Sequence, residues 1–237
     1  MSTTPKYELV KDQTLDFHGR TLHRIRALRD FGSVKTGDLG GYVESEANLS
    51  HDGNCWINGN ALVEGTAEVG GNALVSDDAV IGGNASVAGD AQVGGDALVN
   101  GEARVGGKTK VGGNATISGK ATIDGWARVS GWAAVSGNAK VEGEAQVAGI
   151  AVVRGEAKVS GNAKVEGKAW VGGKAKVSGN TVLLDGVHTA AQPESSESAT
   201  KLRAQAAEHQ SQTAALLERA AALEAQEAAN AAPTPGM

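Results

Sequence analysis

The sequence GNAKVEGEAQVAGIAVVRGEAKVSGNAKVEGKAWVGGKAKV, residues 137–177, repeats a six-residue unit, G-x-A-x-V-x. The unit runs without a break through residues 53–184 as 22 copies. Its aliphatic position holds 17 Val, four Ile and one Leu, and its small position holds Ala in 19 copies. The other small residues are Cys55, Thr109 and Thr181, and Asp77 replaces the glycine in one copy. A repeat of this length decides the fold, so it is interpreted before any single motif.

The period of six predicts short strands separated by corners. Within A-x-V, alternation places the small and aliphatic residues on one face and the middle residue on the other. A helix is excluded, because a glycine in every sixth position would cost about 0.5–1 kcal/mol each time. Three sides make a coil of 18 residues, and successive coils pair strand on strand. We therefore predict an all-β parallel β-helix over residues 37–186, interrupted once by two extra residues within 50–52.

The pattern is similar to the hexapeptide repeat, [LIV]-x-x-x-[STAV]-x, of left-handed parallel β-helices, and the resemblance implies the left hand. Residues 6–36, together with the stretch RIRALRDFGSVKTGDLGGYVESEANLSHDGNCWI at residues 24–57, resemble the N-terminus of uncharacterised hexapeptide-repeat proteins of phages and prophages. This likeness implies a fold and a provenance, and it places the protein in the host cytoplasm or on the virion. It implies no established activity.

The two ends of the chain depart from the repeat. Residues 1–36 are predicted to cap the first coil, with strands at 14–17 and 21–28 joined by a hairpin turn at His18, Gly19 and Arg20. Residues 187–198 are predicted to be a linker. Residues 199–230 are Ala-rich with a weak heptad pattern, which predicts an α-helix that either forms a coiled coil or stays alone in solvent. Residues 231–237 are predicted to be disordered.

Composition and charge exclude several classes of protein. A single cysteine excludes a disulfide scaffold and a cysteine-built zinc site. The opening residues contain no apolar leader, and no stretch approaches 18 apolar residues, so we expect neither Sec export nor a membrane span. The net charge of −5 does not suggest nucleic acid as a partner. We expect no metal and no cofactor.

The residues offer one catalytic candidate. Hexapeptide-repeat proteins are often acyltransferases with a general-base histidine, but none of the five histidines lies within residues 53–184. His51 lies in the insertion beside Asp52, where it is either a base with its orienting carboxylate or a polar turn residue. Cys55 is predicted to be a small core residue. Asp77 and Asp78 are predicted to form a solvated corner rather than a cation site.

The outward positions carry more information than these motifs. Residues 53–102 contain seven acids and no Lys or Arg, whereas residues 103–186 contain 12 bases and six acids. Every third outward residue shares one face, and one of the three faces has no charge: Leu62, Val80, Leu98, Thr116, Ala134, Val152 and Trp170. Trp132 and Ile150 are predicted to extend this apolar stripe at a corner, with Trp126 on the adjoining side. Such a stripe is typical of an interface.

These patterns leave three functions open. We expect a non-catalytic structural or interaction module, a virion accessory or host-interaction protein that forms a parallel homotrimer through the stripe. In the alternative arrangement, the C-terminal helix of the same chain covers the stripe. The alternative functions are a counter-defence protein that sequesters a small molecule between subunits, and an acyltransferase that uses His51. The protein partner is not identified by the sequence.

Overall fold

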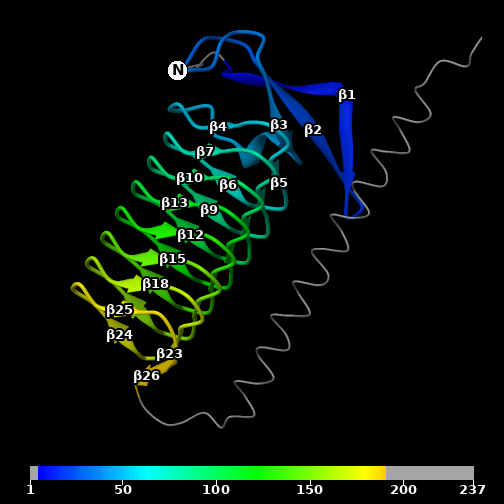
Figure 1. Ribbon diagram of the computed structural model, residues 1–237. Coiled ribbons are helices and arrows are strands. Elements are labelled where there is room, and N and C mark those ends of the chain that lie inside the picture. Colours follow the sequence, from blue (N-terminus) through cyan, green and yellow to red (C-terminus); the bar gives the residue numbers. More distant parts are fainter. Residues whose placement is uncertain (1–4, 191–237) are drawn as a thin grey trace, which may run out of the picture. The chain divides into compact units, whose positions relative to one another are not determined.

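The computed structural model describes residues 5–190, which form a parallel β-solenoid of three sheets (Figure 1). Nearly every A-x-V segment forms a two-residue strand that contributes to one of these sheets in turn. The eight strands of one sheet correspond to about eight turns of the chain. The predicted repeat β-helix is confirmed at this level.

Each sheet collects every third strand. The eleven-stranded sheet contains β1 (Tyr7–Phe17), β2 (Arg20–Ala27), β3 (Leu39–Val43), β5 (Leu62–Val63), β8 (Val80–Ile81), β11 (Leu98–Val99), β14 (Thr116–Ile117), β17 (Ala134–Val135), β20 (Val152–Val153), β23 (Trp170–Gly173) and β26 (Val187–Ala190). The eight-stranded sheet contains β4 (Trp56–Ile57), β7 (Leu74–Val75), β10 (Gln92–Val93), β13 (Lys110–Val111), β16 (Arg128–Val129), β19 (Gln146–Val147), β22 (Lys164–Val165) and β25 (Val182–Leu183). The seven-stranded sheet contains β6 (Glu68–Val69), β9 (Ser86–Val87), β12 (Arg104–Val105), β15 (Thr122–Ile123), β18 (Lys140–Val141), β21 (Lys158–Val159) and β24 (Lys176–Val177).

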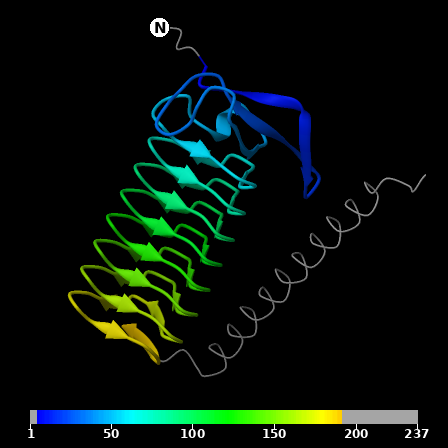
Figure 2. The same ribbon diagram turned by 45° about the horizontal axis from the view of Figure 1, so that its top comes forward.

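The core is a stack of identical positions on successive turns, and the strands lie one above another in both views (Figure 2). Val135 pairs with Ile117 on one side and Val153 on the other, and all three side chains have no exposed surface. The small and aliphatic residues from Cys55 to Val177 are buried in the same way. The predicted inward column is therefore confirmed.

The corners favour glycine because φ is positive and the backbones of successive turns approach closely there. Gly137 has a φ of 70°, and a Cβ at this residue would lie 2.9 Å from the backbone nitrogen of Gly155. Asp77 adopts the same conformation with a φ of 61°. Its Oδ2 accepts a hydrogen bond of 2.8 Å from the Gly95 N–H, so the carboxylate ties this corner to the next turn.

The first coil is longer than the others, as the insertion predicts. Val43 pairs with Val63 and Leu49 bridges to Val69, so the partners are 20 residues apart instead of 18. The short 3-10 helix η1 (Glu46–Asn48) lies in this coil, ahead of the two extra residues.

The N-terminal segment forms a hairpin that continues the eleven-stranded sheet. β1 and β2 are antiparallel, β2 pairs antiparallel with β3, and β3 pairs parallel with β5. The turn has two residues with positive φ, His18 at 53° and Gly19 at 75°, as a tight hairpin turn requires. β1 starts at Tyr7, seven residues earlier than the predicted strand, with a register shift between Val10 and Thr14.

The predicted start of the linker, at residue 187, is wrong. β26 pairs with β23 through four residues, from Trp170↔Val187 to Gly173↔Ala190. Residues 187–190 are therefore strand and not linker, because their backbone completes the eleven-stranded sheet. Residues 1–4, the rest of the predicted linker, the predicted helix at 199–230 and the tail at 231–237 lie outside the described residues.

Candidate interaction surface

The outward face of the eleven-stranded sheet carries the uncharged column. The strand pairing stacks its members in one continuous row, Leu62, Val80, Leu98, Thr116, Ala134, Val152 and Trp170. Six of the seven are half-buried and therefore reach the surface. Leu62 differs, because it lies between Tyr42 and Val80 and is only 8% exposed. The accessible stripe thus begins at Val80 and not at Leu62.

Two corner residues extend this stripe and a third does not. Trp132 and Ile150 follow β16 and β19 and precede β17 and β20, so they lie where the eight-stranded sheet turns into the eleven-stranded one. They are 46% and 45% exposed. Trp126, 56% exposed, lies between β15 and β16, at the corner of the seven- and eight-stranded sheets. Its ring is 4.4 Å from the Lys108 ammonium, on a different edge of the solenoid.

Trp170 lies near the end of the stripe and is fixed by its neighbours. The guanidinium of Arg154 lies 5.0 Å from the centre of its ring. The ring also occupies the space where a side chain at residue 172 would start, which explains a glycine there. The large apolar surface of Trp170 is therefore held against the sheet and remains half-buried.

The other two sheets present charged columns. Lys158 pairs with Lys140 and Lys176 on the seven-stranded sheet, and Lys110 pairs with Arg128 on the eight-stranded sheet. Like charges at directly opposed positions destabilise a sheet. Lys158 partly offsets this with a 2.6 Å ion pair to Glu142. The same turns therefore carry charged residues on two faces and none in the outward column of the third. The uncharged column is thus not the result of a general lack of charged residues in these turns.

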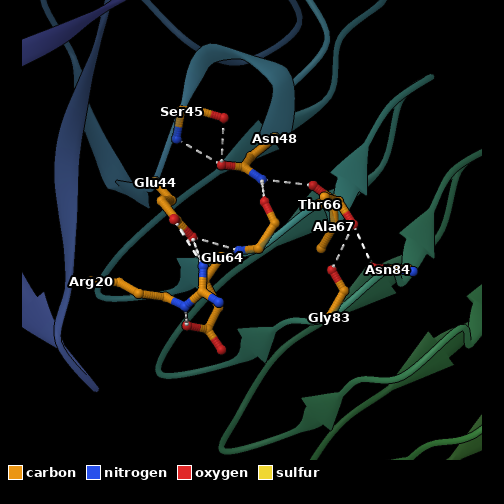
Figure 3. A network of polar contacts seen from close by, with 10 residues as sticks. Arg20, Glu44, Ser45, Asn48, Glu64, Thr66, Ala67, Gly83 and Asn84 are labelled. Carbon is orange, nitrogen blue, oxygen red and sulfur yellow. Dashed lines mark hydrogen bonds and ion pairs between the residues drawn. The ribbon is translucent and has the colours of Figure 1, made fainter.

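A polar network fastens the hairpin to the first coil (Figure 3). Arg20 on β2 donates to both oxygens of Glu44 at 2.9 Å, and its Nε lies 3.5 Å from Glu64. Glu44 accepts a 2.7 Å hydrogen bond from the Gly65 N–H, which is the main reason that its pKa is lowered. Buried Asn48 donates to the carbonyls of Gly65 and Ala67 (Figure 3). Sequence patterns did not identify this network, because its members come from three separate segments.

His51 lies under the N-terminal strand. Its Nδ1 accepts a 3.1 Å hydrogen bond from the backbone N–H of Lys6, and its ring stacks on Tyr7 with centroids 4.4 Å apart. The neighbouring Asp52 donates its backbone N–H to the Ser50 hydroxyl. The imidazole therefore joins the N-terminal strand to the insertion.

Lys6 and Tyr7 belong to a buried cluster that the sequence did not reveal. Lys6 has no exposed surface, and its Nζ donates to the carbonyl and the sulfur of Cys55. The Tyr7 hydroxyl shares its one hydrogen between the carbonyl oxygens of Leu49 at 2.8 Å and Glu46 at 3.0 Å, and burial raises the pKa of its phenol. A hydrophilic lysine near a chain end gives no sequence signal for burial.

Pockets, metal-binding clusters and membrane-spanning helices are further features that could indicate a function. A hollow of about 270 Å³ on the seven-stranded sheet is lined by Ala47, Ser50, Glu68, Val69, Gly70, Ser86 and Ala88, and His51 is not among these residues. Within residues 5–190, no three His, Cys, Asp or Glu side chains are grouped so as to hold a metal ion. In the same part of the chain, no helix has the length and apolar character needed to cross a membrane.

Comparison with protein families supports the repeat architecture. A family model described as YdcK Beta solenoid repeat matches residues 91–107, which include β10, β11 and β12. No curated protein matches the chain. The match lies within the repeat, over residues 91–107 only, and supports a β-solenoid repeat protein.

Proposed function

We propose that the protein is a non-catalytic interaction module, a rigid solenoid that assembles through the uncharged face of its eleven-stranded sheet. The observation that carries this proposal is the contrast between three faces of the same turns. The outward column on one face holds no charged residue from Val80 to Trp170, and the columns on the other two faces present lysine and arginine. A face that is only exposed to solvent gains nothing from lacking charged residues, whereas a face that packs against another protein does.

The proposed assembly is a parallel homotrimer. Cyclic assemblies close on themselves and leave no unpaired copy of the interface. In a parallel arrangement, each of Trp132, Ile150 and Trp170 also lies at the same height along the common axis as the same residue in the other subunits. Aromatic residues are enriched at the centres of interfaces. The left hand of the solenoid and a role in a phage virion or in host interaction follow from the resemblance and belong to the same proposal.

The alternatives gain no support from the site. An acyltransferase base needs a free imidazole nitrogen directed at a cleft. The Nδ1 of His51 instead accepts a hydrogen bond from the Lys6 backbone N–H, which places the hydrogen of a neutral ring on Nε2 and leaves no free lone pair, and the ring is stacked on Tyr7. These contacts favour a structural role for His51. No described feature favours a small-molecule ligand between subunits.

The test replaces Trp170 by glutamate and measures molar mass by light scattering. A glutamate at residue 170 would remove the large apolar surface of the indole ring and place a charge in the packed interface, so Trp170→Glu should reduce the trimer to a monomer. Lys176→Glu is the matched control, because Lys176 lies outward in the next strand on the seven-stranded sheet. An unchanged mass for Trp170→Glu, or an equal loss for both variants, would contradict the proposal.

A further inference from the structure

The buried amine of Lys6 lies directly against the thiol of Cys55. Its Nζ is 3.1 Å from Sγ and 2.9 Å from the Cys55 carbonyl oxygen. Both residues have no exposed surface, and the ring of Phe31 lies 5.1 Å from Nζ. The two groups come from positions 49 residues apart in the chain. The amine and the thiol therefore meet where the N-terminal segment covers the first coil.

The surroundings orient the two groups toward each other. The sulfur lies 3.4 Å from the carbonyl oxygen of Ser50 and 3.6 Å from that of Asp52. A carbonyl oxygen can only accept, so the hydrogen in these contacts is that of the S–H group. The thiol hydrogen is thus directed at these carbonyls, and a sulfur lone pair remains for the Lys6 side. Among residues 5–190, no carboxylate lies within ion-pair distance of Nζ.

An unpaired ammonium is costly in such a site. Burial is the largest effect on Lys6, and it lowers the pKa of the amine. Lowering the pKa increases the share of the neutral amine, which has a free electron pair. A neutral amine beside a thiol is a pair of nucleophiles that an oxidant can join.

We propose that Lys6 and Cys55 form a covalent N–O–S cross-link in the presence of dioxygen. The S–H bond and one N–H bond break, and an S–O bond and an O–N bond form. One oxygen atom of dioxygen stays in the bridge, and the other leaves as water with the two hydrogens. Sulfur and nitrogen each give up two electrons, and dioxygen accepts four. The amine and thiol need to approach only slightly from their 3.1 Å separation.

Such a bridge would act as a covalent lock on the cap. It would join Lys6, one residue before β1, to the coil that precedes β4. Strong reductants would open it, as they reverse the lower steps of cysteine oxidation. The inference is independent of the proposed trimer, because neither residue lies on the uncharged face.

The test is peptide mass spectrometry of the full-length protein, kept either in air-saturated buffer or under reductant without oxygen. Trypsin cuts an unmodified chain after Lys6, and it releases Cys55 in the peptide of residues 36–104, since no Lys or Arg lies between Lys35 and Arg104. A bridged Lys6 resists cleavage. The peptide ending at Lys11 should then remain joined to residues 36–104, with one added oxygen and two fewer hydrogens, and reductant should separate the two.

Cys55→Ala and Lys6→Arg are the matched controls, and neither should show the joined peptide. The conclusion does not depend on how well they fold, because the decisive measurement is made on the wild-type chain. Recovery of separate, unmodified peptides after exposure to air would overturn the proposal. Cys55 carrying added oxygen atoms beside a freely cleaved Lys6 would also overturn it, because the thiol would then oxidise without the amine.

Discussion

Each inward valine is enclosed by the turns before and after it. Val135 touches no solvent and lies between Ile117 and Val153. Val135→Asp should destabilise the middle turns by about 4 kcal/mol, because the new carboxylate is buried without a partner. Chemical denaturation followed by circular dichroism checks this. Lys140→Asp is the control, since Lys140 points outward on the next strand, and equal loss in both variants would contradict the inward assignment.

Tyr7 makes the stability of the cap depend on pH. Its single O–H hydrogen lies between two buried backbone carbonyls, so Tyr7→Phe should cost about 1–2 kcal/mol at neutral pH. Burial raises the pKa of Tyr7 above its ordinary value of 10.0. Above that pH the unfolded chain releases the phenolic proton while the folded chain keeps it, so the free energy of unfolding falls as pH rises.

The phenylalanine variant lacks this titration. The difference in unfolding free energy between wild type and Tyr7→Phe should therefore shrink between about pH 8 and about pH 11. The lowered pKa of Lys6 has the opposite effect on stability, but it is common to both proteins and cancels in the difference. Urea denaturation at the two pH values measures it, and a constant difference would show that the phenol is not buried in solution.

At the scale of the elements, the corners determine how closely the turns can stack. Gly137→Ala would introduce a Cβ 2.9 Å from the Gly155 backbone nitrogen and would strain a φ of 70°. The conformational part alone costs about 1–2 kcal/mol. Gly179 has a φ of 67° with no atom within 4 Å of its Cβ position, so Gly179→Ala should carry only this part. Thermal unfolding compares them, and equal losses would contradict the close approach of the turns.

The repeat predicted most of these elements because each unit is a local rule. Alternation and glycine spacing indicated the strands, the inward column and the longer first coil. β26 was missed because residues 187–190 lack the repeat and become strand only by pairing with β23. The burial of Lys6 and of Leu62 was missed for the same reason, since both depend on segments distant in sequence. The uncharged column was visible in advance because the period assigns outward residues to faces.

At the scale of the whole molecule, the N-terminal segment covers one end of the solenoid, and an apolar stripe runs along one face. The hairpin covers the first coil, and the Arg20–Glu44 contacts fasten it. The face from Val80 to Trp170 lies along the stacked turns of the eleven-stranded sheet. Its occupant is another subunit in the proposed assembly, and the residues after Ala190 in the alternative. The two arrangements differ in what happens when those residues are removed.

The most direct test of the account is therefore the molar mass of a chain that ends at Ala190, measured by light scattering beside the full-length protein. Ending the chain there keeps β26 and its pairing with β23. If the uncharged face is the interface between subunits, the shortened chain should have the mass of three copies, as should the full-length protein. A full-length monomer whose shortened form aggregates would contradict the account, because the stripe would then be covered by the end of its own chain.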